Sequence, residues 1–321
     1  MAPHTLKKED PRLSVMIGSI RLSNPTILAS GVLGVAAGGL IRAWQDGAGA
    51  VVTKTTGMEP RAGHPGPRIV GVYENSLINA MGIPNPGIVE YLSEVQIVLD
   101  NGVVVIGSAV GSSPEEFAAV AEAYVKAGVK AIELNVSCPH VGSLYLMGLD
   151  PQSVFDVVTA VQKRINQKVP IWVKLPGSTD YPRLIEVARS AESAGASAVV
   201  ALNTLPALAI DPISRHPMLG AGIGGLSGPA IKPIAVRAVW ELHRAEISIP
   251  IIGVGGILSG SDVIEYLLAG ATAVEIGTGV LTHGTTIFDK ICQQLIRYLK
   301  HQEIDQVEDL VGQIHDSGVD Y

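Results

Sequence analysis

The chain alternates between short apolar segments and longer amphipathic segments. Eight apolar runs predict buried strands at 26–30, 50–54, 103–108, 131–136, 170–175, 198–202, 249–253 and 272–277. Helical periodicity predicts helices at about 39–47, 87–99, 114–127, 151–166, 181–194, 229–245, 261–269 and 285–299. Continuous apolar strands, each followed by a helix, are typical of a parallel sheet with helices packed on its faces.

Four segments repeat one local pattern: "DGAGAVV" (46–52), "KAGVKAIEL" (126–134), "SAGASAVV" (193–200) and "LAGATAVEI" (268–276). In each, an amphipathic stretch ends at glycine, which supplies the left-handed cap, and a β-branched run follows. Eight strand–helix units most simply close into a single (β/α)₈ TIM barrel, which is α/β and spans 1–321. An open, doubly wound sheet is the alternative.

Two segments flank this predicted barrel. The run "LSVMIGSIRL" (13–22), within an N-terminal arm of 1–23, predicts a β-hairpin that turns at Gly18 and Ser19 and closes the barrel bottom. A tail at 302–321 carries "EIDQVEDLVG", which predicts a short helix packed on the barrel. Within the barrel, the loops at about 55–86 and 203–228 are too long to be simple connectors. Both follow strands, so we expect them at the C-terminal face, where such barrels carry out chemistry.

The composition argues against several classes of protein. Apolar residues make up 47% of the 321 residues, charged residues only 17%, and the formal net charge is −7. The chain contains no dense run of Lys and Arg, so nucleic-acid binding is not expected. No apolar run is long enough to cross a membrane. The N-terminus lacks a signal-peptide core. Two cysteines are too few for a disulfide framework or a four-thiolate iron–sulfur cluster, so a reducing cytoplasm is the expected compartment.

Polar residues cluster where the predicted strands end. These positions are Ser30, Lys54, Thr55, Asn135, Cys138, Lys174, Asn203 and Thr204. Polar residues at strand ends can simply face solvent. Exposure to solvent alone is a poor explanation for two lysines, two asparagines and a cysteine at one barrel mouth. The sequence therefore predicts a catalytic site there.

Glycines after the last two strands predict a phosphate site. Gly255 and Gly256 follow the seventh strand, and Gly277 and Thr278 follow the eighth. Backbone N–H groups of these loops commonly bind phosphate in barrels, and glycine permits close approach. By contrast, "GAGIGG" (220–225) fits a dinucleotide pattern without its strand–turn–helix context, so we interpret it as a flexible loop.

Two side chains have more than one interpretation. Lys174 suits a Schiff-base lysine or a fixed positive charge beside a cofactor. Cys138 suits a base or nucleophile, because the strand end and Pro139 place it at the mouth. Cys292, inside the last predicted helix, is interpreted as a small buried residue.

Taken together, these motifs resemble the dihydroorotate dehydrogenase family, in its cysteine-using branch. The resemblance covers nearly the whole chain and is carried by "NPTILASG" (24–31), "VVTKTT" (51–56), "PRIV" (67–70), "INAMGIPNPG" (78–87), "IELNVSCP" (132–139), "VKL" (173–175), "LNT" (202–204), "GGLSGPAIKPIAVR" (224–237), "PIIGVGGI" (250–257) and "AVEIGTG" (273–279). It implies an FMN-containing barrel that oxidises dihydroorotate to orotate in pyrimidine biosynthesis.

The resemblance also implies residue roles. Cys138 would be the general base that removes the C5 proton, while hydride leaves C6 for flavin N5. Lys174 would stabilise the reduced ring. The substrate would contact Lys54, Asn79, Asn135, Asn203, Thr204 and, through its carboxylate, the backbone of Ala80, Met81, Gly82 and Ile83. The cofactor would be held by Ser30, Lys54, Thr55, Asn135, Lys174, Leu202, Gly228, Gly255, Gly256, Gly277 and Thr278.

Within the family, "GGLSGPAIKP" is closest to the NAD-linked subclass, in which a partner subunit carries FAD and an iron–sulfur cluster. A homodimer is a further family expectation. Three departures stand out: His140 replaces a substrate-contacting asparagine, Ser108 lies near a flavin-contacting asparagine position, and "LNTLPA" lacks the usual glycine. A histidine directly after "SCP", as at His140, also resembles the flavin domain of dihydropyrimidine dehydrogenases, which act on uracil and thymine. A Schiff-base aldolase and a non-catalytic phosphate-binding barrel are the remaining alternatives.

Overall fold

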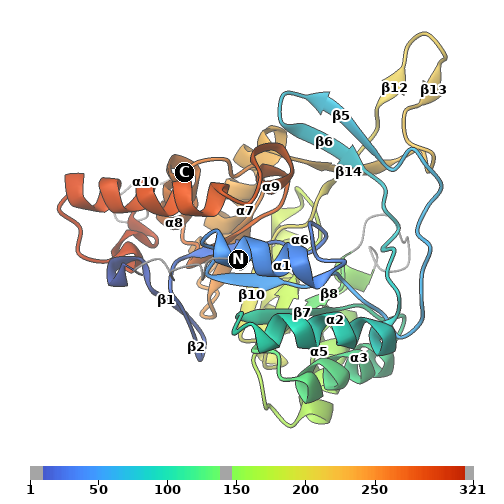
Figure 1. Ribbon diagram of the computed structural model, residues 1–321, viewed down its shortest axis with the longest axis horizontal. Helices are drawn as coiled ribbons and strands as arrows, with labels where there is room; N and C mark the ends of the chain where they lie inside the picture. The colour runs from blue at the N-terminus through green and yellow to red at the C-terminus, as the bar shows by residue number, and fades with distance from the viewer. Residues whose placement is uncertain (1–9, 138–146, 315–321) are drawn as a thin grey trace.

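The computed structural model, which describes residues 10–137 and 147–314, is a closed parallel barrel ringed by helices (Figure 1). Its strand order is β10-β15-β16-β3-β4-β7-β8-β9. The strands are β3 (Thr26–Leu28), β4 (Ala50–Val52), β7 (Val105–Ala109), β8 (Ala131–Asn135), β9 (Ile171–Lys174), β10 (Ala198–Ala201), β15 (Ile251–Val254) and β16 (Ala273–Ile276). All eight predicted strands are confirmed, and closure of the barrel excludes the open sheet.

The predicted helices are confirmed with shifts of one or two residues at most boundaries. They are α1 (Ala37–Gln45), α2 (Ile88–Asp100), α3 (Pro114–Ala127), α5 (Pro151–Ile165), α6 (Tyr181–Ser193), α7 (Lys232–Arg244), α8 (Gly260–Leu268) and α10 (Ile287–His301). The helix predicted at 229–245 begins as a separate 3₁₀ turn, η2 (Pro229–Ile231). Helix α9 (Thr278–His283) was not predicted.

Local chemistry sets these boundaries. Ser113, Asp150 and Asp180 cap the N-termini of α3, α5 and α6, each accepting a backbone N–H bond through its side-chain oxygen. At the end of α3, Gly128 adopts φ +102°, the left-handed cap expected of the repeated junction.

Register decides which strand residues face the barrel interior. Ser108 pairs with Glu133, Glu133 with Trp172, and Val254 with Glu275. In-register neighbours in a parallel sheet point to the same face, and alternate residues along a strand share that face. Lys174, two residues after Trp172, therefore points inward with them, so the barrel interior carries charged groups as well as apolar ones.

The N-terminal hairpin forms as predicted, from β1 (Val15–Ile17) and β2 (Ile20–Leu22), with a left-handed turn at Gly18. Ile17 and Leu22 are fully buried in the main core. A Cβ on Gly18 would lie 3.6 Å from Ser197, which precedes β10, so the hairpin contacts the N-terminal end of the barrel. Figure 1 shows it at the lower left, away from the β5–β6 sheet.

The two long loops contain a sheet that the sequence did not predict. Strands β5 (Ile69–Tyr73), β6 (Ser76–Asn79), β11 (Leu205–Ala207) and β14 (Gly224–Ser227) form an antiparallel sheet in the order β11-β14-β6-β5. Strands β12 (Ile210–Asp211) and β13 (His216–Pro217) form a ribbon beyond it, at the upper right of Figure 1. The sheet joins the two loops into one layer beside the barrel mouth.

The interpretation of "GAGIGG" as a flexible loop was wrong. Gly224 and Gly225 belong to β14, and a Cβ on Gly224 would lie 2.6 Å from the Ile78 side chain and 2.8 Å from Asn79 O. A Cβ on Gly220 would lie 2.8 Å from Pro65 O. These glycines allow close packing of backbones, which is a different reason for glycine than flexibility.

The described part of the tail forms the expected short helix, which is the 3₁₀ helix η3 (Val307–Leu310). Val307 and Leu310 are fully buried, and the Gly312 N–H donates to Leu267 O at the end of α8. Across the described ranges 10–137 and 147–314, no helix is long and apolar enough to cross a membrane.

Candidate active site

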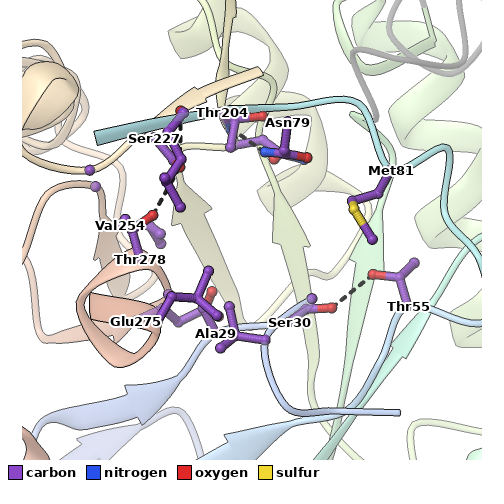
Figure 2. Close-up of a pocket in the computed structure, with 18 of the residues that line it drawn as sticks. Ala29, Ser30, Thr55, Asn79, Met81, Thr204, Ser227, Val254, Glu275 and Thr278 are labelled. Atoms are coloured by element: carbon purple, nitrogen blue, oxygen red, sulfur yellow. Dashed lines mark hydrogen bonds between the residues drawn. The ribbon is translucent and has the colours of Figure 1, made fainter. Parts of the chain in front are cut away.

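A cavity of about 270 Å³ opens at the carboxyl ends of the barrel strands. Seventeen residues predicted for the site line it: Ser30, Lys54, Thr55, Asn79, Met81, Gly82, Ile83, Asn135, Lys174, Leu202, Asn203, Thr204, Gly228, Gly255, Gly256, Gly277 and Thr278. Figure 2 shows how segments far apart in sequence meet around it: Ser227 and Thr278 lie on one side, and Ser30, Thr55 and Met81 lie on the other.

Three charged side chains meet in the barrel interior. Lys174 Nζ lies 2.5 Å from Glu275 Oε2 and 3.8 Å from Glu133 Oε2. Both carboxylate side chains have 0% relative exposure and the lysine side chain 7%. Lys174 and Glu275 line the cavity, whereas Glu133 lies behind them. A buried charge is costly unless it is paired, so this cluster is a strong electrostatic feature of the site.

The cluster shifts the ionisation of its members. Burial raises the pKa of Glu133 well above its usual range, the neighbouring charge of Glu275 adds to this, and Lys174 opposes it only in part. Burial acts to lower the pKa of Lys174, but the two carboxylates outweigh it, and the pKa of Lys174 lies above its ordinary value. The two carboxylates thus favour the charged form of Lys174, and burial favours the protonated form of Glu133.

A chain of hydroxyl groups runs from the cavity into the barrel wall. Ser30 Oγ lies 2.8 Å from Thr55 Oγ1, which lies 2.9 Å from Ser108 Oγ. Asn135 Nδ2 also donates to Thr55 Oγ1, at 3.3 Å, and Ser108 Oγ donates to Glu133 Oε1 at 3.5 Å. Thr55 thus connects the ends of β3, β4, β7 and β8 and orients the polar groups on this side of the cavity.

A second network lies around Asn203. Its Nδ2 group donates to Ser137 Oγ at 3.2 Å, to Ser137 O at 3.3 Å and to Asn135 Oδ1 at 3.4 Å. The Thr204 N–H donates to Asn203 Oδ1 at 2.8 Å. Asn79 Nδ2 donates to Gly225 O at 3.2 Å, which connects β6 to β14. Amide groups from three separate segments therefore surround the same space.

The predicted phosphate region is built from glycine turns. Gly255 and Gly256 adopt φ +138° and +69° after β15, a region that favours glycine. A Cβ on Gly256 would lie 2.7 Å from Lys232 Cβ and 2.8 Å from Gly228 O. Thr278 Oγ1 donates to Ser227 Oγ at 2.9 Å, which joins the turn after β16 to β14 (Figure 2).

Some predicted positions lie elsewhere. Cys138 and His140 lie outside the described residues. Ala80 does not line the cavity: it is fully buried in a small core beneath the β5–β6 sheet, and its N–H donates to Arg68 O. Ser108 also lies behind the lining, within the hydroxyl chain. Cys292 is half-buried on α10 and packs against the main core, close to the expected interpretation.

Sequence reasoning missed three polar residues. Glu133 and Glu275 lie inside the apolar runs "AIELN" and "AVEIG", and an acidic residue in a buried strand is itself a signal, because such burial is rare without a partner. Ser227 was missed because it belongs to the unpredicted sheet. Apolar lining residues, including Ile69, Leu77, Ile231, Ile257 and Leu281, carry no such signal.

Comparison with known proteins decides the family. The sequence profile of "Dihydroorotate dehydrogenase" matches residues 12–299. The chain belongs to the dihydroorotate dehydrogenase family. It is 44% identical over 310 residues to the "Dihydroorotate dehydrogenase B (NAD(+)), catalytic subunit" of Methanocaldococcus jannaschii, covering 95% of this chain and 98% of that protein. The protein of the same name from Pyrococcus horikoshii is 45% identical over 303 residues, covering 94% and 97%.

A solved dihydroorotate dehydrogenase from Eimeria tenella, in complex with ferulenol, shares the fold. The TM-score is 0.85 at 22% identity, over 98% of this chain and 91% of that one. Family membership confirms the predicted resemblance. Enzymes of the dihydroorotate dehydrogenase family use a flavin, and the cavity fits such a group: glycine turns open at one end, and the Lys174 cation lies on its floor.

Proposed function

We propose that this member of the dihydroorotate dehydrogenase family oxidises dihydroorotate to orotate with FMN as its flavin, in pyrimidine biosynthesis. The observation that carries this proposal is the convergence on one cavity of a buried cation, three asparagine side chains and two glycine turns. A cation meets the negative charge that a flavin gains on reduction, amides match the polar edge of a pyrimidine ring, and glycine turns suit a phosphate.

The cofactor side of the cavity is formed by the turns and the barrel floor. Gly255, Gly256, Gly277 and Thr278 would hold the FMN phosphate, because their backbone faces the cavity at the loops where barrels commonly bind phosphate. The ring would lie against Lys174. The residues Ser30, Lys54, Thr55, Asn135, Leu202 and Gly228 would complete this side. The bound flavin supplies the acceptor, at N5, for the hydride that leaves C6 of the substrate.

The substrate side is formed by amides and backbone. Asn79, Asn135, Asn203 and Thr204 would hydrogen-bond the pyrimidine ring, and the backbone of 81–83 would meet the substrate carboxylate. Lys54 would lie between substrate and cofactor. The hydrogen bonds among Asn203, Asn135 and Ser137 orient these groups before substrate binds, and preorganised groups lose little entropy on binding.

Cys138 would remove the proton from C5 of the substrate. That carbon lies next to a carbonyl group, so its proton is weakly acidic and requires a positioned base. Support comes from Ser137, the preceding residue. It is held by hydrogen bonds to two residues that line the cavity: Asn203 Nδ2 donates to its carbonyl oxygen, and its own N–H donates to Asn135 Oδ1 at 3.4 Å. A thiol there serves as a base in its thiolate form.

The relatives are named as catalytic subunits, which implies a second, electron-transfer subunit. We propose that this partner carries FAD and an iron–sulfur cluster and delivers electrons to NAD. The chain has two cysteines in all, too few to hold a four-thiolate cluster itself. A homodimer of this chain is proposed as the catalytic core.

The test separates cofactor identity from base chemistry. The flavin is first released by denaturation and identified, and FMN is the expected result. The holoprotein is then mixed anaerobically with dihydroorotate, and flavin absorbance is followed for the parent, Cys138→Ala and Cys292→Ala. We expect the Cys138 variant to bleach about 10² to 10⁴ times more slowly, the usual contribution of a general base. The Cys292 variant should match the parent. Equal rates for all three would remove Cys138 from the mechanism.

A further inference from the structure

We infer that Glu133 and Glu275 act as positioning residues that share one proton and, with the Lys174 ammonium, form an internally neutral triad behind the flavin. The inference rests on the proposed placement of the flavin against Lys174. It concerns how the protein fixes the charge of that lysine, and so how strongly the lysine can favour the reduced cofactor.

Geometry gives the first argument. The three side chains come from β8, β9 and β16, and β16 lies on the far side of the barrel from β8. Register directs all three into the interior, where Lys174 Nζ lies 2.5 Å from Glu275 Oε2 and 3.8 Å from Glu133 Oε2. One cation therefore faces two carboxylates in a space with little solvent.

Unsatisfied atoms give the second argument. Glu133 Oε2 and Glu275 Oε1 are buried and have no hydrogen-bond partner among the described residues when both carboxylates are taken as acceptors. A buried oxygen without a donor is costly, and two ionised carboxylates close together repel each other. One proton placed between the two carboxylates supplies the missing donor and removes the repulsion.

Charge balance gives the third argument. With both carboxylates ionised, the cluster would carry a net charge of −1 inside the barrel. With one shared proton, the ammonium and the single remaining negative charge cancel. The other polar group facing Glu133 is the neutral Ser108 hydroxyl from β7, at 3.5 Å, which adds no charge. Burial strongly favours the neutral arrangement.

The functional consequence concerns the flavin. A neutral triad keeps Lys174 protonated, because Glu275 pairs with it directly, yet adds no net charge to the barrel interior. If either carboxylate is replaced by glutamine, the other keeps or adopts the single negative charge, so the triad stays neutral. The two glutamates therefore buffer each other, and each single replacement should leave the reduction potential of the flavin almost unchanged.

Infrared difference spectroscopy tests the shared proton without using the flavin. At neutral pH the parent should show the carbonyl band of a buried protonated carboxylic acid. The band should disappear in Glu133→Gln and in Glu275→Gln, since each leaves one ionised carboxylate beside Lys174. Glu303→Gln, on the exposed tail, is the matched control and should keep the band. Absence of the band in the parent, or its survival in both single variants, overturns the inference.

The reduction potential tests the consequence. In each single variant, the equilibrium constant for two-electron reduction of the flavin should stay within about threefold of the parent value. At pH 6 the double variant should favour the reduced form at least tenfold more, about 30 mV for two electrons, because Lys174 then lacks any counter-charge. A tenfold shift in one single variant, or a parent-like double variant, would contradict buffering. Should the double variant not fold, the single isosteric variants still decide. A protein that binds no flavin refutes the proposed function, while the infrared result still stands.

Discussion

Asn203 Nδ2 lies 3.3 Å from the carbonyl oxygen of Ser137, so the loop after β10 is bonded to the residue immediately before Cys138. The same amide also reaches Asn135 Oδ1. One side chain thereby connects the proposed substrate contacts to the segment that carries the proposed base. In the proposed mechanism, this arrangement would couple substrate binding to proton removal.

Asn203→Ala should therefore damage substrate handling more than cofactor binding. Loss of a hydrogen-bonding partner at a buried polar site costs about 1–3 kcal/mol, which corresponds to roughly 5- to 150-fold in kcat/KM for dihydroorotate. Flavin content should remain at the parent level. Steady-state kinetics with a flavin count per chain measures both. Asn101→Ala, at the exposed end of α2, is the control. An unchanged kcat/KM would remove Asn203 from the site.

Gly256→Ala should abolish tight flavin binding. Its φ of +69° is unfavourable for alanine, and the added Cβ would meet Lys232 Cβ at 2.7 Å and Gly228 O at 2.8 Å. Gly102→Ala is the control for backbone strain without a steric clash, since Gly102 has φ +73° and nothing lies within 4 Å of the added Cβ. Both variants carry the backbone strain of about 1–2 kcal/mol. Flavin affinity, measured by fluorescence titration, should fall only in the Gly256 variant; equal affinities would place the phosphate elsewhere.

Thr55→Val should weaken flavin binding about tenfold, because the change leaves the polar groups of Ser30, Ser108 and Asn135 without a shared partner. Thr56→Val makes the same substitution at the next residue, which is buried and does not line the cavity. Parallel titrations with FMN compare the two. A larger loss in the Thr56 variant would mean that general destabilisation of this strand end, and not the hydroxyl chain, controls binding.

Stability should depend on pH through Glu133. Burial and the neighbouring charge of Glu275 hold the pKa of Glu133 in the folded protein well above its ordinary value of 4.5, so folding takes up a proton at pH values between the unfolded and the folded pKa. Stability therefore falls as pH rises above the unfolded pKa, by up to about 1.4 kcal/mol per pH unit. Glu133→Gln should lack this pH-dependent loss of stability. Its free energy of unfolding should therefore rise relative to that of the parent between pH 5 and pH 8. Chemical denaturation at each pH measures the difference. Parallel curves would show that Glu133 is ionised in the folded protein.

Much of the barrel followed from the sequence because its signals are local. Each buried strand is a continuous apolar run, and Gly128 and its counterparts mark the helix ends within a few residues. Because the carboxyl ends of parallel strands meet at one face of the barrel, the sequence alone places residues such as Ser30, Lys174 and Asn203 together.

The unpredicted features depend on contacts between distant segments. Strand β14 pairs with β6 across about 150 residues of sequence, and Gly224 and Gly225 in it have low strand propensity. Gly224 is explained by its close packing against Ile78 and Asn79, which lie far from it in sequence. The triad of Glu133, Lys174 and Glu275 was missed for a similar reason: its members come from separate strands, and only barrel closure brings them within ion-pair distance.

Anaerobic reduction of the bound flavin by dihydroorotate is the decisive measurement for the proposed function. The purified holoprotein is mixed with dihydroorotate, or separately with dihydrouracil, and the flavin absorbance is recorded. We expect rapid bleaching by dihydroorotate and little by dihydrouracil, which lacks the carboxylate that the 81–83 backbone is proposed to meet. Bleaching by dihydrouracil in preference to dihydroorotate would refute the proposed substrate and assign the enzyme to the metabolism of uracil and thymine.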